Sequence, residues 1–375
     1  MQHKLRLYWQ LLHDKERLIA LQHSGSVDDF VRQMAQYLDW PDLNLDLMQS
    51  FLQQQNSSVL VPDLELFSQF WQPADYRKKD QALIWVPALD PLKQPFYKED
   101  MLIQKGKLLA VFIRPVTLVK DLLPQSNNLA DLCPDLIIFH WSRCGSTLLG
   151  GLYRQLSAVK LLSESMLISD MLLDSFWSEE AKPQLLKLAV LLQGRFRHGE
   201  TQLVLKLNSW DLQQWPLWLQ QFPDARILCL GRQPEAILAS HQRMSGLHMV
   251  AVNGVWQAGN PYDLSLSPLQ GRIAVLRLLM CYTEQLLGTG KAEFLDYRQL
   301  KQVLQQNPQQ LVSFLSRELT EAEQQRWHTF SLRDAKQPEL IFQASQSPQQ
   351  IFTTEELQQI HNELGVEYQA LLQRG

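Results

Sequence analysis

A strand, a turn and a helix follow one another over residues 136–156, and this segment constrains the fold more than any other. It opens with an apolar run, Leu-Ile-Ile-Phe, which has the length and composition of a buried parallel strand. A polar turn with one cation, Arg143, and one glycine, Gly145, follows, and apolar residues then recur at helical spacing from 148 to 156. A strand that leads through a tight turn into a helix creates an anion site, because unpaired backbone N–H groups and the positive end of the helix dipole meet there.

The turn differs in two ways from the Walker A loop, G-x-x-x-x-G-K-[ST]. The first glycine is absent, and Ser146 stands at the position of the lysine. That lysine and Mg²⁺ together handle the γ-phosphate of a nucleoside triphosphate. Without it, the backbone N–H groups, the hydroxyls of Ser146 and Thr147 and the cation of Arg143 suit a single phosphate-like group. A strand-to-helix turn that binds no ligand is the alternative.

A second segment has the same layout. Residues 225–231 predict another buried strand, which runs into Arg232 and then a helix from about 235 to 243. Pro234 suits the first position of that helix, where its missing N–H is not needed. Arg232 therefore lies at the carboxyl end of a strand, where open α/β sheets bind ligands. Ser240, in the following helix, is predicted to reach the same anion.

Further elements complete the alternation. A strand is predicted at 203–207 and a long helix at 269–287. Strands that alternate with helices form a parallel sheet with right-handed crossovers, so the fold class is α/β.

Two motifs, R-x-G-[ST]-T after one strand and R-x-P-x5-S after a later one, resemble those of the sulfotransferases that use 3′-phosphoadenosine 5′-phosphosulfate. Residues 293–300 (EFLDYRQL) resemble the late strand-to-helix segment of the same family. The resemblance covers roughly residues 135–325 and implies a P-loop NTPase-like three-layer fold with a central parallel sheet. It also implies that the phosphosulfate nucleotide is the co-substrate and that no metal is required.

The family's binding residues carry over onto matching positions. The resemblance implies that the 5′-phosphosulfate is bound by Arg143, Cys144, Gly145, Ser146 and Thr147, and the 3′-phosphate by Arg232 and Ser240. The chain departs from the family at three places: Ser142 replaces the usual proline, Cys144 the middle serine, and Gln233 an aspartate or asparagine. These departures make it a divergent member.

Sulfuryl transfer needs a cation near the bridging oxygen and a base for the acceptor proton. Lys206, at the end of the strand 203–207, is the predicted cation. Cytosolic family members carry a histidine base two residues after this lysine, but that position is Asn208, which cannot act as a base. Residues 157–164 resemble the pattern of the tyrosylprotein and heparan sulfotransferases, which implies that Glu164 is the base, and a raised pKa is expected for it in an apolar cleft. The alternatives are a loop glutamate exposed to solvent or an N-cap partner for the helix predicted at 166–173.

Composition restricts the partners and the location. The chain has 375 residues and a net charge of −4, so no general basic field exists for nucleic acid or anionic membranes. Its four cysteines are scattered without C-x-x-C pairing, which favours a reducing compartment and argues against zinc. No signal-peptide pattern opens the sequence, and no apolar run approaches about 18 residues, so a cytoplasmic location without a membrane span is expected.

Residues 1–130 carry no recognisable chemistry and are predicted to form an N-terminal α+β region of unknown role. Helices are predicted at 5–21, 27–38 and 43–52, and strands at 81–87 and 101–114, the second with a possible hairpin turn at 105–107. Residues 131–375 then form the sulfotransferase-like P-loop domain.

Two other functions are open. A P-loop kinase or NTPase is disfavoured by Ser146 at the lysine position and by the lack of a clear Walker B aspartate. A non-catalytic module that keeps the nucleotide fold is disfavoured by the retained Arg143, Arg232 and Ser240. The acceptor, a small molecule or a peptide or glycan with a hydroxyl or amine, and the oligomeric state are not encoded in recognisable motifs.

Overall fold

The computed structural model describes residues 2–57, 61–251, 254–257, 259–337, 339–341 and 347–374. The chain forms two compact units. The first comprises residues 1–132 and 166–199, and the second comprises residues 133–165 and 200–375.

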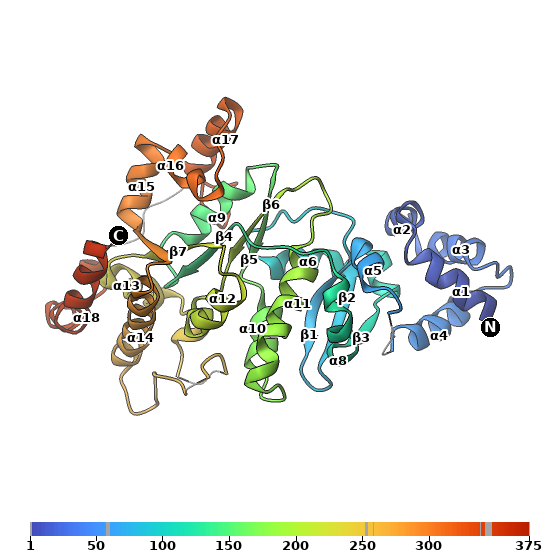
Figure 1. The fold of residues 1–375 in the computed structure, drawn as a ribbon, viewed down its shortest axis with the longest axis horizontal. Helices are drawn as coiled ribbons and strands as arrows, with labels where there is room; N and C mark the ends of the chain where they lie inside the picture. The colour runs from blue at the N-terminus through green and yellow to red at the C-terminus, as the bar shows by residue number, and fades with distance from the viewer. Residues whose placement is uncertain are drawn as a thin grey trace. The chain divides into compact units, whose positions relative to one another are not determined.

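A five-stranded parallel sheet forms the centre of the second unit (Figure 1). Its strands are β4 (Leu136–His140), β5 (Val159–Ser163), β6 (Gln202–Lys206), β7 (Arg226–Gly231) and β8 (Ala292–Asp296). Their order is β5-β6-β4-β7-β8, so the strand that leads into the anion loop lies in the middle. Every residue of β4 and β5 is buried, as expected for a sheet covered on both faces.

Helices cover both faces of this sheet and make three layers (Figure 1). One group is α9 (Ser146–Arg154), α15 (Tyr297–Gln306), α16 (Gln309–Val312) and α17 (Glu321–Ser331); the other is α12 (Trp215–Gln221), α13 (Pro234–Arg243), α14 (Pro268–Gly288) and α18 (Thr354–Arg374). Leu136 and Ile138 of β4 pack with the first group in one hydrophobic cluster. On the other face, Trp141 donates a hydrogen bond to Thr283 of α14 over 2.8 Å. The predicted α/β three-layer fold with a central parallel sheet is confirmed.

Short 3₁₀ helices connect these elements, namely η3 (Ser209–Gln214), η4 (Leu247–Met249), η5 (Ser313–Leu315) and η6 (Pro348–Gln350). Pro234 occupies the first turn of α13, as predicted. The predicted strand at 203–207, the helix at 269–287 and the late strand-to-helix segment are confirmed as β6, α14 and β8–α15.

The first unit is α+β. Its helices are α1 (Gln2–Leu11), α2 (Lys15–Gln22), α3 (Val27–Tyr37), α4 (Leu45–Gln55), α5 (Leu64–Phe70), α6 (Tyr97–Lys105), α7 (Leu108–Phe112), α8 (Val119–Leu122), α10 (Met166–Leu173) and α11 (Lys182–Gly194), with 3₁₀ turns η1 (Leu123–Asn128) and η2 (Glu179–Ala181). Its sheet is antiparallel, with β1 (Trp71–Arg77), β2 (Ala82–Pro87) and β3 (Val116–Leu118) in that order. The sequence-based division assigned residues 166–199 to the C-terminal domain, but α10 and α11 pack on β1 and on each other. The boundary near residue 130 stays a prediction.

Two local predictions for this unit are wrong. Residues 101–114 form no strand or hairpin, because they belong to α6 and α7, with buried residues at the helical spacing Tyr97, Met101 and Gln104. The helix predicted at 5–21 is two helices, since Asp14 leaves the helical conformation and its side chain caps α2 by accepting the N–H of Arg17. Ser26 caps α3 as predicted.

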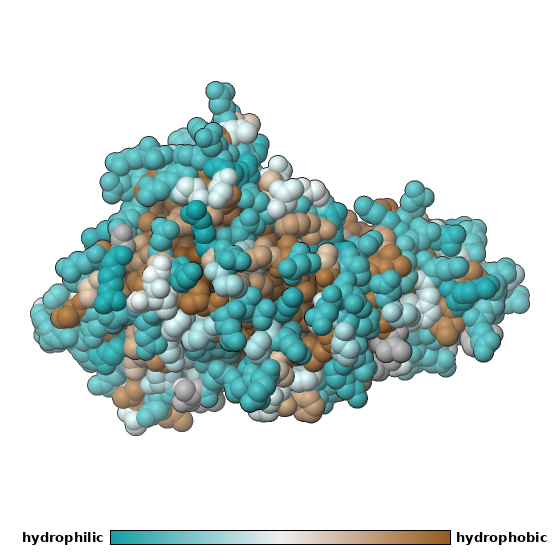
Figure 2. Space-filling view, in the orientation of Figure 1, coloured by the Kyte–Doolittle hydropathy of each residue, from teal (hydrophilic) through white to brown (hydrophobic). Residues whose placement is uncertain are grey.

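The surface of the second unit is polar where the sequence is rich in glutamine. On the face drawn in Figure 2, hydrophilic side chains predominate over α15 to α17. Within the described residues, no helix combines the length and the apolar character needed to cross a membrane.

Candidate functional site

The loop between β4 and α9 has the backbone of an anion cradle. Ser142, Arg143 and Gly145 have φ angles of 63°, 53° and 88°. Successive residues in such conformations turn their N–H groups toward one spot. Gly145 caps α9 without a side-chain hydrogen bond, so the first N–H groups of the helix have no side-chain cap. A Cβ at Gly145 would lie 2.6 Å from the ring of Tyr297, which explains the glycine.

The loop's other side chains differ in their access to an anion. Cys144 is fully buried in the core cluster, and burial raises the pKa of its thiol to about 11. The buried thiol is shielded from solvent, so the predicted contact of Cys144 with an anion would be made through its backbone. Ser146 is 4% exposed and Thr147 is half-buried at the start of α9.

Two arginines meet at this loop. Nη1 of Arg232, just beyond β7, donates a hydrogen bond to the carbonyl oxygen of Arg143 over 3.1 Å. The Arg232 guanidinium also lies 4.7 Å from the centre of the Tyr297 ring, a cation–π contact. Arg143 in turn donates to the carbonyl oxygen of Met244 over 2.9 Å. Each arginine uses one hydrogen bond in this way, and its fork has further N–H donors for a phosphate.

Ser240 lies on α13, where it is half-buried. In the part of the chain that the structure describes, no hydrogen bond joins its side chain to Arg232. Its predicted role at the same anion stays a prediction.

Glu164 and Lys206 form an ion pair beside the loop. Glu164 follows β5 directly, and its N–H donates to the Lys206 carbonyl oxygen over 2.6 Å. Parallel pairing sets Ser163 of β5 opposite Lys206 of β6, which brings the two charged side chains together. Lys206 Nζ lies 2.5 Å from Glu164 Oε1, with the lysine side chain 0% and the glutamate side chain 26% exposed.

The expectation of a raised pKa for Glu164 is wrong. Burial acts to raise the pKa of this carboxyl, but the ammonium of Lys206 and the nearby His140 outweigh it and hold the pKa well below its usual range. In the free protein Glu164 is thus a paired carboxylate with a weak tendency to accept a proton.

From the sequence, His140 at the end of its strand could either pack under the loop or stack on an adenine, and no part in the proton transfer is predicted for it. It ends β4 and is 3% exposed, and its Nε2 lies 3.5 Å from Glu164 Oε1. Its position in the sequence, as a titratable side chain at the carboxyl end of the strand before the loop, is the signal that could have placed it near the site.

Two more histidines lie near these charges. His241 and His248 are 0% and 2% exposed, with ring centres 5.5 Å apart. Burial, together with the other ring, lowers the pKa of His241 to about 2, and burial lowers that of His248 to about 3. Both are neutral at pH 7. Asn208 caps η3 together with Asp211, a structural role that agrees with its lack of base chemistry.

A basic segment, residues 333–336, adds further positive charge near the site. Lys336 interacts electrostatically with Arg143 and Glu164, and its pKa is lowered by burial and by Arg143. Lys206 and Arg143 add two further cations, so Glu164 is surrounded mainly by positive charge.

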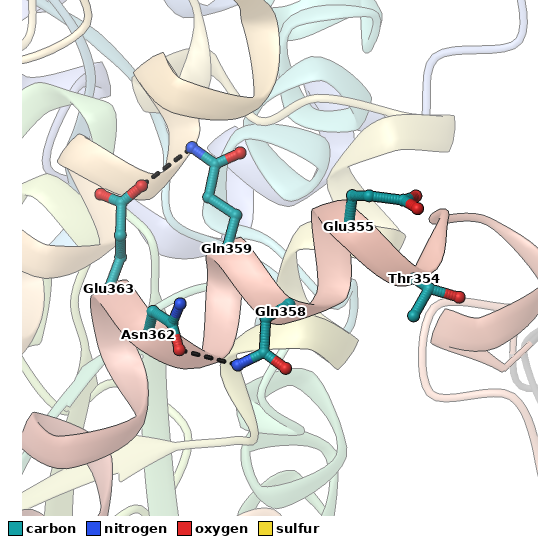
Figure 3. A pocket seen from close by; sticks show the side chains of 6 residues that line it. All are labelled: Thr354, Glu355, Gln358, Gln359, Asn362 and Glu363. Atoms are coloured by element: carbon teal, nitrogen blue, oxygen red, sulfur yellow. Dashed lines mark hydrogen bonds between the residues drawn. The ribbon is translucent and has the colours of Figure 1, made fainter.

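Two further kinds of site, a metal centre and a surface pocket, can be compared with the candidate residues. Among the described residues, no group of three or more His, Cys, Asp or Glu side chains is arranged to hold a metal ion. A pocket along α18 is lined by Thr354, Glu355, Gln358, Gln359, Asn362 and Glu363 (Figure 3). Its side chains pair along the helix, Gln358 with Asn362 and Gln359 with Glu363, and none of the candidate residues lines it.

Comparison with known proteins adds a structural likeness. No family model and no curated protein sequence matches the chain. The chain is similar to sulfotransferases of known structure. Sulfotransferase STF9 from Mycobacterium avium is 15% identical over 65% of this chain and 79% of that one, with a TM-score of 0.42. A sulfotransferase from Alicyclobacillus acidocaldarius is 12% identical over 64% and 95%, with a TM-score of 0.41.

A third similar structure is retinol dehydratase in complex with androsterone and the inactive cofactor PAP. It is 12% identical over 63% of this chain and 81% of that one, with a TM-score of 0.33. With TM-scores this low, the fold is defined by the strand order and layers described above.

Proposed function

We propose that the chain is a sulfotransferase that moves a sulfuryl group from 3′-phosphoadenosine 5′-phosphosulfate to a hydroxyl or amine acceptor. One observation carries the proposal: a phosphate loop without its lysine adjoins a buried lysine–glutamate pair at the same edge of the sheet. The link is direct, since His140 at the end of β4 contacts both Ser142 of the loop and Glu164 of the pair.

The nucleotide's two phosphate-bearing ends would bind at separate cations. The uncapped N-terminus of α9, the loop N–H groups and Arg143 suit the 5′-phosphosulfate. Arg232 is held against the loop by its bond to the Arg143 carbonyl and is available for the 3′-phosphate, with Ser240 as its proposed partner. A bidentate arginine suits a terminal phosphate because its planar fork matches two phosphate oxygens.

In the proposed reaction, the acceptor oxygen or nitrogen forms a bond to sulfur as the bond from sulfur to the bridging phosphate oxygen breaks. The electron pair of that bond stays on the 5′-phosphate of the leaving 3′,5′-adenosine bisphosphate, where the Lys206 ammonium stabilises the charge. The acceptor proton passes to Glu164. Since Lys206 holds Glu164 as a poor base in the free protein, the lysine must exchange this contact for the phosphate before Glu164 can act.

The kinase or NTPase alternative lacks its characteristic side chains. Ser146 has no charge to place on a γ-phosphate. Asp296 does end a strand, β8, but its carboxylate caps α15 by accepting the Arg298 N–H and also accepts the Tyr368 hydroxyl over 2.6 Å. It lies on an edge strand and is occupied, so it is poorly suited to hold Mg²⁺ for a nucleotide.

Thermal unfolding with two nucleotides tests the proposal. At about a hundredfold excess over the dissociation constant, 3′,5′-adenosine bisphosphate should raise Tm by roughly 3–6 °C, because ligand binding to the native state adds about 2.7 kcal/mol. ATP with Mg²⁺ should cause a much smaller shift. Stabilisation by ATP–Mg²⁺ alone would support the kinase reading, and no response to either nucleotide would support a non-catalytic module.

The acceptor and the location stay predictions. A small molecule or a peptide or glycan is compatible with the exposed loop around Met244, which is 63% exposed beside Arg143. The cytoplasmic location is proposed from the scattered cysteines, which favour a reducing compartment.

A further inference from the structure

The imidazole of His140 connects the phosphate loop to the proposed base. Its Nδ1 lies 3.0 Å from the backbone N of Ser142 and 3.2 Å from the hydroxyl oxygen of Ser209. A backbone N–H can only donate, so Nδ1 must be the accepting nitrogen. In the neutral ring the proton is then on Nε2.

The ring is neutral at physiological pH. His140 is 3% exposed, and burial lowers its pKa although Glu164 acts in the opposite direction. Nε2 lies 3.5 Å from Glu164 Oε1, a long contact, and the backbone of Leu207 also interacts with the ring. A buried donor with only long contacts is costly, and contacts of this kind commonly tighten when a substrate binds.

The same oxygen of Glu164 faces both His140 and Lys206. In the proposed reaction Lys206 moves to the leaving phosphate, so Glu164 loses its charged partner at the moment when it must accept a proton. A neutral N–H donor can keep the carboxylate oriented without the strong fall in proton affinity that a cation causes.

We propose that His140 is the positioning residue for Glu164, fixed by the phosphate loop through Nδ1 and orienting the carboxylate through Nε2–H. This inference rests on the proposed function, since it gives Glu164 the role of base. It does not involve contact between His140 and the acceptor or the nucleotide.

Two amide variants separate the two ends of the ring. In His140→Asn the short amide can offer an oxygen near the Nδ1 position, which keeps the Ser142 contact and loses the contact to Glu164. In His140→Gln the longer amide can place an N–H near the Nε2 position, which keeps the Glu164 contact and loses the one to Ser142. Each variant is the control for the other.

We expect one variant to lose turnover and the other to lose nucleotide affinity. His140→Asn should bind 3′,5′-adenosine bisphosphate like the original protein but lower kcat by about ten- to a hundredfold, because the base is less well oriented. Its acid limb in the pH profile of kcat should move to higher pH, since a carboxylate that loses a hydrogen-bond donor has a higher pKa. His140→Gln should retain kcat within about threefold, a small loss on the scale of a misplaced group, and bind the nucleotide more weakly.

The charges that face Glu164 from other elements are the same in both variants. They are Lys206 on β6, Arg143 in the loop, Lys336 in the basic segment and the neutral His248 on η4. A shift of the acid limb in His140→Asn alone would therefore report the lost Nε2 contact. Equal kcat values in the two variants, or an unmoved acid limb in His140→Asn, would overturn the inference.

A measurement that needs no turnover keeps this test separate from the proposed function. Nitrogen NMR of the wild-type protein with isotope-labelled histidines should show that His140 is protonated at Nε2 and unprotonated at Nδ1. The Ser142 amide hydrogen should exchange slowly with solvent. A proton at Nδ1 would overturn the inference even if both variants failed to fold. Failure of the original protein to bind 3′,5′-adenosine bisphosphate would instead overturn the proposed function.

Discussion

Glu164→Gln should lower kcat by about a thousandfold, within the range of a lost general base, while the affinity for 3′,5′-adenosine bisphosphate changes by no more than a few-fold. Glutamine has nearly the shape of glutamate but cannot accept the acceptor proton. Its amide can still lie beside Lys206, which loses an ion pair but not its position on β6. Steady-state turnover with the best acceptor found in a panel, together with calorimetric binding of the bisphosphate, measures both effects.

Glu179→Gln is the matched control. Glu179 also pairs with a buried lysine, Lys182, over 2.6 Å, but it belongs to the first unit and its side chain is 79% exposed. This variant should retain full turnover. If Glu164→Gln is as active as the control, Glu164 is not the base, and a neutral imidazole such as that of His248 becomes the next residue to test.

Arg232→Ala should remove most of the stabilisation by 3′,5′-adenosine bisphosphate. Hydrogen bonds to a charged group contribute about 1.5–3 kcal/mol each, and a bidentate arginine makes two. The dissociation constant should therefore rise by at least about a hundredfold, since 1.4 kcal/mol corresponds to a factor of ten. Loss of the 3.1 Å bond to the Arg143 carbonyl should also loosen the loop and add to the effect.

Arg226→Ala is the control for charge on the same strand. Arg226 begins β7 and is exposed, whereas Arg232 follows the carboxyl end of that strand. Binding of the bisphosphate by Arg226→Ala should stay within about twofold, because a single exposed charge at the far end of the strand interacts weakly through solvent. Equal weakening in both variants would mean that general charge, and not a specific contact of Arg232, drives nucleotide binding.

The strands and helices of most of the second unit could be predicted from the sequence. Apolar runs of strand length alternate there with helical periodicity, and this pattern leaves few topologies for a parallel sheet. Ser146 and Pro234 are local signals in the sequence. The structure places Ser146 at the start of α9 and Pro234 in the first turn of α13, as predicted.

Other features depend on contacts between distant residues. The pKa of Glu164 falls because Lys206, 42 residues further along, arrives beside it on the neighbouring strand. The link from His140 to Glu164 arises in the same way, from β4 and β5 ending at one edge of the sheet. The helices α6 and α7 were mistaken for strands, because a short apolar run fits either periodicity and tertiary packing decides between them.

The proposed activity is tested most directly with 3′-phosphoadenosine 5′-phosphosulfate that carries a radiolabel in its sulfuryl group. The purified protein is incubated with this donor and a panel of phenols, alcohols and amines. We expect label to appear on at least one acceptor, with an equal amount of 3′,5′-adenosine bisphosphate released, and both products to form about a thousandfold more slowly with Glu164→Gln. Transfer of phosphate from ATP–Mg²⁺ to an acceptor, with no transfer of label from the phosphosulfate donor, would contradict sulfotransferase activity.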